Sequence, residues 1–460
     1  MKGVLITAPA RGVGKSLVSC GLIELWNQSY NTVGFKCGPD YLDCAFQENL
    51  LGVPSANLDS FFLQEEQLRE LWKLKTVGQD MAVLEGAGGY YDGIGGNTTK
   101  ASAFDLSSIL HIPSIMVIDM LQGTSISLAA VVKGFLNLRE NSNIEGIILN
   151  RISKHHYAAI KEVLEKELEV PVLGYLPNIA DITFSSRWDG MIKPEEEKDW
   201  REQIHLVSLV LKENLDMEKL FGIMEKYEAE RSWESTPLEI EKLGLEKEEK
   251  LDGPVIAVAK DQAFCYLYEE NLEVLKRMGA KLKFFSPLKD KKIPSDAQGL
   301  YLCGGYPEYH GAALSGNTSM RNSILKAIRN KMPTIAECGG FLYLHENLEC
   351  DDGKIYPMVG AIHCNAYKGH ALQHRGYLHM TAQRDTLILK EQETIPVHEL
   401  HEYKSELVGK DYEVKRVSKK GQWTDGHGGE SLYAGFHHLY FMAYPQVAGA
   451  FLEKAAAWQS

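Results

Sequence analysis

Short apolar runs alternate with helical patterns along the first 150 residues. The runs are GVLITA (3–8), TVGFK (32–36), MAVLE (81–85), SIMVID (114–119) and GIILN (146–150), each bounded by turn or helix signals. Runs this uniformly apolar are typical of strands that helices cover on both faces. Their alternation with helical stretches predicts an α/β fold with a parallel, doubly wound sheet.

A second α/β pattern opens with PVIAVA (254–259) and continues through KLKFFSP, GLYLCGG and PTIAECGG. Between the two patterns lie an amphipathic stretch, from KPEEEKDW to MEKYE, and the charged segment EIEKLGLEKEEKLDGP. The first reads as helix and the second as a solvated connector. We therefore predict a first domain over 1–192, a helical and charged linker over 193–252 and a second domain over 253–460.

Composition places the chain among ordinary globular proteins. It has 460 residues, 44% of them hydrophobic and 24% charged, which is enough for two or three domains. The net charge of −13 argues against a general nucleic-acid binder. No apolar run approaches the roughly 20 residues that span a bilayer. The chain starts with a glycine-rich segment unlike a signal peptide, and its eight cysteines show no CxxC spacing. We therefore expect a cytoplasmic protein.

A phosphate-binding loop is the strongest local pattern of the first domain. The segment ARGVGKS (10–16) lies between a predicted strand and a predicted helix, where glycines let backbone N–H groups face an anion. The residues predicted to bind ATP are Gly12, Val13, Gly14, Lys15 and Ser16, with Lys15 at the β/γ-phosphates and Ser16 on Mg²⁺. Ala8 and Pro9 replace the usual start of such loops, which leaves the nucleotide open.

Carboxylates follow the ends of the predicted strands, where ligands gather in open α/β sheets. Asp40 and Asp43 follow TVGFK, Glu85 ends MAVLE, and Asp92 comes soon after it. Mg²⁺ needs oxygen ligands beyond those of a triphosphate, and one or two such carboxylates suffice. Helix capping or turn formation is the alternative role for each acid.

A cysteine stands in a strand–turn–helix pattern in the second domain. In PTIAECGGF, Cys338 occupies the turn, where a thiol at a helix N-terminus has a lowered pKa and is exposed for attack. Gly339 brings an N–H toward an oxyanion, and Gly304 and Gly305 of LCGGYP offer a second donor. We predict that Cys338 is a nucleophile and not merely a small buried side chain.

A nucleophilic thiol requires a base, and AGFHHLYF offers both His437 and His438. Spacing alone does not choose between them. His398 and His401 in HELH have a spacing that suggests a metal site, but the sequence shows no matching set of cysteines or acids.

These residues resemble one known family over nearly the whole chain, that of the cobyrinic acid a,c-diamide synthases. The matching stretches are GVGKS, FKCGPDYLD, NLDSFF, VLEGAGGYYDG, GIILNR, AFCYLYEENLE, LYLCGGYPEYHGAALSGN, TIAECGGFLYL and HELH. The resemblance implies an ATP-dependent, glutamine-using amidoligase of cobalamin biosynthesis. It implies a dethiobiotin-synthetase-like P-loop domain followed by a class I glutamine amidotransferase domain.

The resemblance also assigns roles to particular residues. AGFHHLYF is similar to the family form A-S-Y-L-H-L-H-F, which places the base on His438 and puts His437 where the family has leucine. Related amidotransferases have an acid two residues later; here that residue is Tyr440, so a Cys338–His438 dyad without an assured third carboxylate is implied. Ser16, Asp43 and Glu85 are implied as Mg²⁺ ligands. The residues implied to handle the acceptor are Asp40, Tyr41, Leu42 and Asp92.

The implied reaction joins two chemistries. Cys338 releases ammonia from glutamine, and a tetrapyrrole carboxylate that ATP has converted to an acyl phosphate takes up that ammonia. A sheltered passage for ammonia between the domains is a hypothesis, tested by whether external ammonium dilutes the nitrogen. The expected partners are small molecules (a tetrapyrrole polycarboxylate, glutamine and ATP), with no nucleic acid and no membrane, and a homodimer is allowed.

One departure from the family keeps other acceptors open. Residues 186–191 read SRWDGM where the family is close to E-R-H-L-G-L. The alternatives are Ni-sirohydrochlorin and hydrogenobyrinic acid, with the same chemistry. Cobyric acid synthase fits less well because it lacks the GPDYLD-like and HELH-like elements in this form.

Two alternatives belong to other classes. A partitioning-type ATPase would carry a lysine where this chain has Ala10. An amidotransferase that uses only free ammonia would not need Cys338 and His438, so the presence of both residues argues against this alternative.

Overall fold

The computed structural model describes residues 1–120, 126–179, 194–234, 253–370, 374–418 and 420–459. The chain divides into two compact units, Met1–Thr236 and Pro237–Ser460. The altered loop at 186–191 and the charged segment over 235–252 lie outside the described residues.

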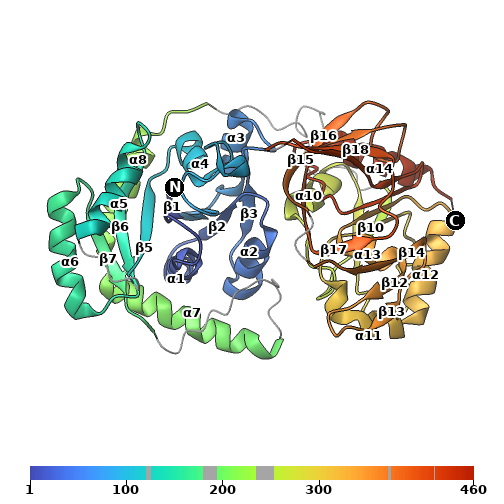
Figure 1. The fold of residues 1–460 in the computed structure, drawn as a ribbon, viewed down its shortest axis with the longest axis horizontal. Coiled ribbons are helices and arrows are strands. Elements are labelled where there is room, and N and C mark those ends of the chain that lie inside the picture. Colours follow the sequence, from blue (N-terminus) through green and yellow to red (C-terminus); the bar gives the residue numbers. More distant parts are fainter. Residues whose placement is uncertain (121–125, 180–193, 235–252, 371–373, 419, 460) are drawn as a thin grey trace. The chain divides into compact units, whose positions relative to one another are not determined.

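A seven-stranded parallel sheet forms the centre of the first unit, in the order β3-β2-β4-β1-β5-β6-β7 (Figure 1). Its strands are β1 (Lys2–Thr7), β2 (Thr32–Cys37), β3 (Ser55–Leu58), β4 (Met81–Glu85), β5 (Ser114–Asp119), β6 (Ile144–Asn150) and β7 (Val172–Leu176). The five predicted strands are confirmed. The sequence analysis missed β3, which is short and half polar, and β7, which a glycine interrupts.

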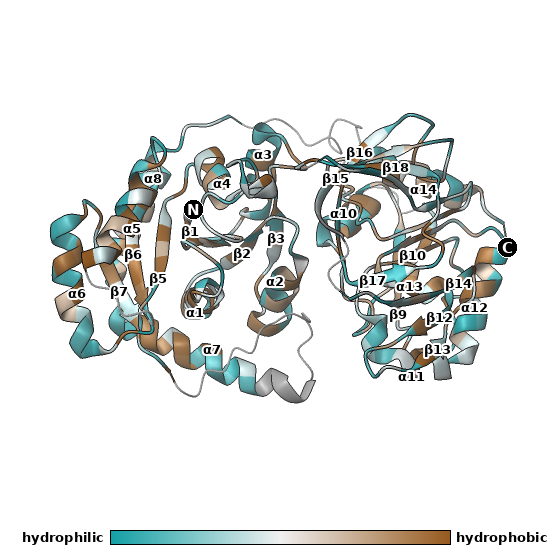
Figure 2. Cartoon of the chain, in the orientation of Figure 1, coloured by the Kyte–Doolittle hydropathy of each residue, from teal (hydrophilic) through white to brown (hydrophobic). Residues whose placement is uncertain are grey.

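Helices cover this sheet, and hydrophobic residues are concentrated on strands such as β5 and β6 (Figure 2). The helices are α1 (Lys15–Asn27), α2 (Tyr41–Phe46), α3 (Glu65–Lys75), α4 (Ala103–Leu110), α5 (Ile126–Asn137) and α6 (Lys154–Glu167), with shorter turns η1 (Gln47–Leu51) and η2 (Ile94–Gly96). α1 buries Val18, Leu22 and Ile23, an apolar stripe at helical spacing. The doubly wound α/β class is therefore confirmed for this unit.

Two further helices, α7 (Pro194–Asn214) and α8 (Met217–Glu230), belong to the first unit, although the sequence analysis places them in a linker. Val207 and Leu211 of α7 are fully buried in the unit's core. α7 lies so close to α1 that a Cβ at Gly21 would come within 2.6 Å of Leu211 Cδ1. The charged face of α7 resembles a linker, while its apolar face completes the core.

A six-stranded sheet forms the centre of the second unit, in the order β20-β21-β11-β10-β8-β9. Its strands are β8 (Val255–Ala259), β9 (Lys281–Phe285), β10 (Gly299–Leu302), β11 (Thr334–Glu337), β20 (His427–Gly428) and β21 (Leu432–Gly435). The predicted β8, β9, β10 and β11 are confirmed. The helices are α10 (Glu269–Arg277), α11 (Gly311–Gly316), α12 (Thr318–Arg329), α13 (Gly339–Leu344) and α14 (Pro445–Ala457), with the turn η3 (Pro307–His310).

Two four-stranded sheets, which the sequence analysis did not predict, lie between β11 and β20 in the chain. One has the order β13-β12-β14-β17 and the other β16-β15-β18-β19. Their strands are β12 (His345–Glu349), β13 (Ile355–Pro357), β14 (Ile362–Lys368), β15 (His374–Ala382), β16 (Thr394–His401), β17 (Tyr403–Ser405), β18 (Tyr412–Arg416) and β19 (Gln422–Asp425). A β-bridge between His398 and His438 joins the HELH strand to the C-terminal histidine segment.

Among the helices of the described ranges, none combines the length and the apolarity that crossing a membrane requires.

Candidate active sites

The phosphate loop joins β1 to α1 and is fixed by the end of β6. Gly12 and Gly14 have φ values of +77° and +98°, which favour glycine. A Cβ at Gly14 would lie 2.2 Å from Asn150 Nδ2, so this close approach also excludes a side chain. Asn150 Nδ2 donates to Val13 O at 2.8 Å, and Arg151 donates to Gly12 O at 3.1 Å. Two side chains at the end of β6 thus hold carbonyl groups of the loop.

Lys15 begins α1, and its side chain turns back toward the loop. Its Nζ donates to Ala10 O at 2.9 Å and to Gly88 O at 2.8 Å. Burial lowers the pKa of Lys15 to about 8, while the charge of Glu85 opposes that change. The ammonium group is therefore positioned between two glycine-rich turns.

A buried carboxylate, Glu85, forms the centre of the charged cluster beside the loop. Ser16 Oγ donates to Glu85 Oε1 at 2.5 Å, and Lys36 Nζ contacts the same oxygen at 2.9 Å. Lys36 Nζ also lies 2.5 Å from Asp43 Oδ2. Burial alone would lower the pKa of Lys36, but the charges of Asp43 and Glu85 raise it well above its usual value.

The structure thus brings together Ser16, Asp43 and Glu85, the three residues predicted to hold Mg²⁺. It adds Lys36, which the sequence analysis missed; the available signal was a lysine inside an otherwise apolar strand. Glu85 is 1% exposed, and within the described residues its Oε2 has no hydrogen-bond partner. A buried carboxylate oxygen without a partner, beside a hydroxyl, is a donor set that fits Mg²⁺.

The predicted acceptor residues lie on two loops. Asp40 precedes α2, which Tyr41 begins, and the backbone N–H of Leu42 bonds to the Asp40 carboxylate. Desolvation by the surrounding loop and the charge of Asp43 raise the pKa of Asp40 to about 6, although its side chain remains in contact with solvent. On the other loop, Asp92 Oδ2 accepts from Gly89 N at 3.1 Å and shapes the turn after β4.

Cys338 occupies a strained turn between β11 and α13. Its φ of +44° and ψ of −102° are rare for a residue with a side chain, as at nucleophile elbows. Cys338 N donates to Gly435 O at 2.8 Å, which ties the turn to β21. The thiol is 5% exposed, and burial raises its pKa, with the charge of Glu308 adding to the effect.

The raised pKa of Cys338 is the opposite of the sequence-based expectation that a position at a helix N-terminus lowers it. α13 has only six residues, and desolvation together with nearby carboxylates outweighs any favourable effect of the helix. The resting thiol is therefore protonated, and its ionisation depends on a base.

His438 follows β21, the strand beside β11, and is 1% exposed. A Cβ on Gly304 would lie 2.7 Å from His438 Cε1, so this glycine makes room for the ring. Gly305 and Gly339 also approach closely, because a Cβ on Gly339 would lie 2.7 Å from Gly305 N. The backbone N–H of His438 donates to His398 O at 2.8 Å. Gly304 therefore packs against the His438 ring, and Gly305 packs against Gly339 at the start of α13.

Glu337 is a residue of this site that the sequence analysis missed. It precedes Cys338 in the chain, and its Oε2 lies 3.8 Å from His438 Nδ1. Leu439 N donates to Glu337 Oε1 at 3.2 Å, and the hydroxyl of Tyr301 donates to Oε2 at 3.3 Å. Burial raises the pKa of Glu337, while His438 acts in the opposite direction. The available signal was an acid ending an apolar strand, the same signal that indicated Glu85.

Two family descriptions match the chain, one in each unit. Residues 4–187 match the CobQ/CobB/MinD/ParA nucleotide binding domain. Residues 255–445 match the CobB/CobQ-like glutamine amidotransferase domain. Fold and sites together therefore define an enzyme with a nucleotide-binding domain followed by a glutamine amidotransferase domain.

Curated relatives match over nearly the full length. The chain is 32% identical over 458 residues to the cobyrinate a,c-diamide synthase of Caldanaerobacter subterraneus subsp. tengcongensis, covering 99% of this chain and 98% of the relative. It is 34% identical over 456 residues to the cobyrinate a,c-diamide synthase of Listeria innocua, covering 97% of this chain and 98% of the relative. It is 33% identical over 456 residues to the cobyrinate a,c-diamide synthase of Thermoplasma volcanium, covering 98% of this chain and 96% of the relative. The chain belongs to the cobyrinate a,c-diamide synthase family.

The lowered pKa of Lys15 predicts a pH-dependent nucleotide affinity. Lys15 is charged below pH 8 and loses its charge above it, whereas bound phosphate would hold the proton. Affinity for ADP without metal should therefore fall about tenfold between pH 7 and pH 9, as measured by calorimetry. The phosphates of ADP are ionised throughout this range, so a flat profile would contradict the buried position of Lys15.

The contact between Gly304 and His438 predicts a selective loss of glutaminase activity. In Gly304→Ala the new methyl group displaces the imidazole, and a shift of about 1 Å costs on the order of a hundredfold in rate. Gly316→Ala is the matched control, because a Cβ there meets nothing within 4 Å. Glutamate release and ADP affinity should be measured for both variants. Equal glutaminase rates in the two variants would show that Gly304 does not position the base.

Proposed function

We propose that this chain catalyses the ATP-dependent amidation of the a and c side-chain carboxylates of cobyrinic acid, with ammonia taken from glutamine. The choice of acceptor rests on the full-length likeness to curated cobyrinate a,c-diamide synthases. The presence of a phosphate loop and a cysteine–histidine site in one chain supports the pairing of the two chemistries.

Glutamine hydrolysis is assigned to the second unit. The Cys338 thiol gives its proton to His438 as the sulfur attacks the side-chain amide carbon of glutamine. The backbone N–H groups of Gly339 and of the Gly304–Gly305 loop stabilise the oxyanion. His438 then protonates the leaving ammonia, and water releases glutamate from the thioester. Glu337, 3.8 Å from His438 Nδ1, favours the charged imidazole that forms between these steps.

Amidation is assigned to the first unit. An acceptor carboxylate attacks the γ-phosphorus of ATP, ADP leaves, and ammonia then displaces phosphate from the acyl phosphate. Lys15 and Lys36 supply positive charge where negative charge accumulates. Mg²⁺, when bound by Ser16, Asp43 and Glu85, would neutralise phosphate charge.

Acceptor binding is assigned to Asp40, Tyr41 and Leu42, with Asp92 on the neighbouring loop. Desolvation raises the pKa of Asp40, and the negative charge of Asp43 adds to the effect, so this loop already carries acidic groups. A polycarboxylate therefore needs the charge of Lys36, which lies between Asp43 and Glu85. Hydrogenobyrinic acid and Ni-sirohydrochlorin pose the same electrostatic requirement and would leave every residue role unchanged.

The acceptor is tested by product mass. The purified protein is incubated with ATP, Mg²⁺ and glutamine, and cobyrinic acid, hydrogenobyrinic acid and Ni-sirohydrochlorin are offered separately. Two successive carboxyl-to-amide changes on cobyrinic acid are expected. Amidation of another tetrapyrrole alone would contradict the proposed acceptor but retain the chemistry. Glutamine hydrolysis without any amidation would contradict all three acceptors.

The nitrogen source is tested with Cys338→Ser. This variant should lose glutamine-supported amidation, by on the order of a thousandfold or more, and keep amidation supported by ammonium chloride. Cys364→Ser is the control, because Cys364 is a partly buried cysteine of the same unit outside the proposed site. Glutaminase activity that survives Cys338→Ser would contradict the assignment of the nucleophile.

A further inference from the structure

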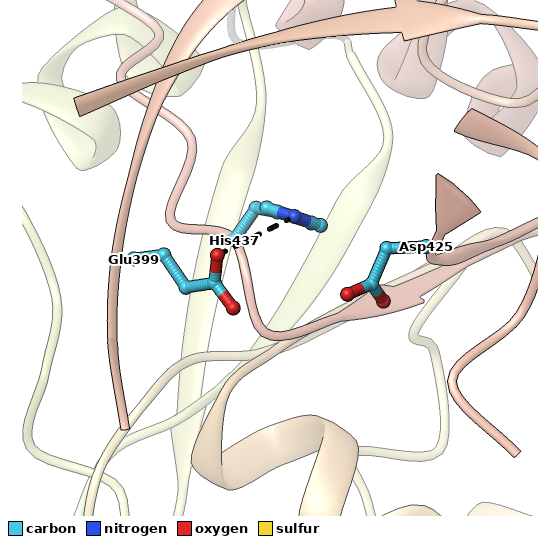
Figure 3. A group of neighbouring side chains, drawn as sticks. All are labelled: Glu399, Asp425 and His437. Carbon is cyan, nitrogen blue, oxygen red and sulfur yellow. Dashed lines mark ion pairs between the residues drawn. The ribbon is translucent and has the colours of Figure 1, made fainter. Parts of the chain in front are cut away.

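Three buried side chains of the second unit converge beside the catalytic segment. Glu399 comes from β16, Asp425 ends β19, and His437 follows β21 (Figure 3). One ligand atom from each lies within 4.8 Å of the other two. Their exposures are 1%, 5% and 0%, so two carboxylates lie in the interior with an imidazole between them (Figure 3). Buried carboxylates require compensation of their charge.

His437 has no role in the chemistry assigned above, and its environment is unusual. Among the described residues, neither Nδ1 nor Nε2 has a hydrogen-bond partner, although the ring is fully buried. Its Nε2 lies 4.0 Å from Glu399 Oε2, which is too long for a hydrogen bond. A buried polar ring aimed at two carboxylates without bonding to them requires an explanation.

Outer hydrogen bonds fix both carboxylates. His401 Nε2 lies 2.6 Å from Glu399 Oε1, and His401 Nδ1 lies 2.6 Å from Tyr403 O. Asp425 Oδ1 accepts from Gly426 N at 2.7 Å, and Oδ2 accepts from Trp423 Nε1 at 3.3 Å. Such supporting contacts are characteristic of metal ligands, whose orientation they set.

We propose that Glu399, Asp425 and His437 bind a divalent transition-metal ion, for which Zn²⁺ is the best match. One imidazole nitrogen and two carboxylate oxygens suit Zn²⁺, and water would complete a four-coordinate shell. In such a shell, ligand atoms about 2.0–2.1 Å from the ion lie about 3.3 Å apart. The present separations, 4.0 Å between His437 Nε2 and Glu399 Oε2 and at most 4.8 Å within the group, exceed this by up to about 1.5 Å, which side-chain rotations would close.

The position of this ion gives it a structural function. It would join β16, β19 and the segment after β21. His438 comes next after His437, and its backbone N–H already bonds to His398, the neighbour of Glu399. The ion would therefore hold the segment that carries the base, independently of which tetrapyrrole is amidated.

The test uses the full-length protein after chelation, titrated with Zn²⁺ or Co²⁺ in excess Mg²⁺, which saturates oxygen-only sites. One equivalent is expected to bind, with the visible absorption of four-coordinate Co²⁺ and a rise in melting temperature with Zn²⁺. His437→Leu places the family's leucine in the site and should weaken binding at least a hundredfold, with the temperature rise lost. His363→Leu removes an exposed imidazole beside Glu346 and should bind the metal as the unmodified protein does.

Asp425→Asn is the second variant and keeps the volume of the side chain. If His437→Leu does not fold, the test rests on Asp425→Asn. Loss of the visible absorption of four-coordinate Co²⁺ in folded Asp425→Asn would then support the proposed site. The proposal is overturned if the chelated, unmodified protein takes up no stoichiometric Zn²⁺ or Co²⁺. It is equally overturned if folded His437→Leu or Asp425→Asn binds the metal as tightly as the unmodified protein.

Discussion

Both sites depend on a carboxylate buried at the end of a central strand. Glu85 ends β4 and Glu337 ends β11, and each is at most 2% exposed. An ionised carboxylate in the interior costs several kcal/mol unless partners surround it. Glu85 is therefore contacted by Ser16 and Lys36, and Glu337 by Tyr301, the backbone of Leu439 and His438. In each unit these partners include groups that the proposed chemistry uses, Ser16 and Lys36 beside Glu85 and His438 beside Glu337, so compensation of one buried charge also brings these groups together.

Burial also sets the protonation of the reactive groups. It lowers the pKa of Lys15 to about 8 and raises that of Cys338, so each charged form is less stable than in water. Phosphate oxygens would stabilise the charge that Lys15 carries below pH 8, and proton transfer to His438 would ionise the thiol. In the proposed mechanism the two groups are therefore brought into their reactive charge states by different partners, a phosphate for Lys15 and a base for Cys338.

Contiguous patterns predicted much of this molecule, and long-range packing explains the rest. The phosphate loop and Cys338 could be predicted because a few adjacent residues define each of them. Glu85 could be predicted because it ends an apolar run. Glu337 also ends an apolar run, but its proposed role depends on its contact with His438, a residue distant in sequence. α7 was assigned to a linker because its charged face is visible in the sequence, whereas the α1 residues that bury its other face are not. The cluster of Glu399, Asp425 and His437 arises from β16, β19 and the segment after β21, and the spacing of these residues in the sequence matches no metal motif.

The most direct measurement compares amidation rates supported by glutamine and by ammonium in Glu85→Gln and Glu337→Gln. If each carboxylate organises its own site, Glu337→Gln loses the glutamine-supported rate and keeps the ammonium-supported rate. Glu85→Gln then loses both rates while its glutaminase activity persists. An unchanged glutamine-supported rate in Glu337→Gln, or full amidation by Glu85→Gln, would contradict the dependence of the two sites on these buried charges.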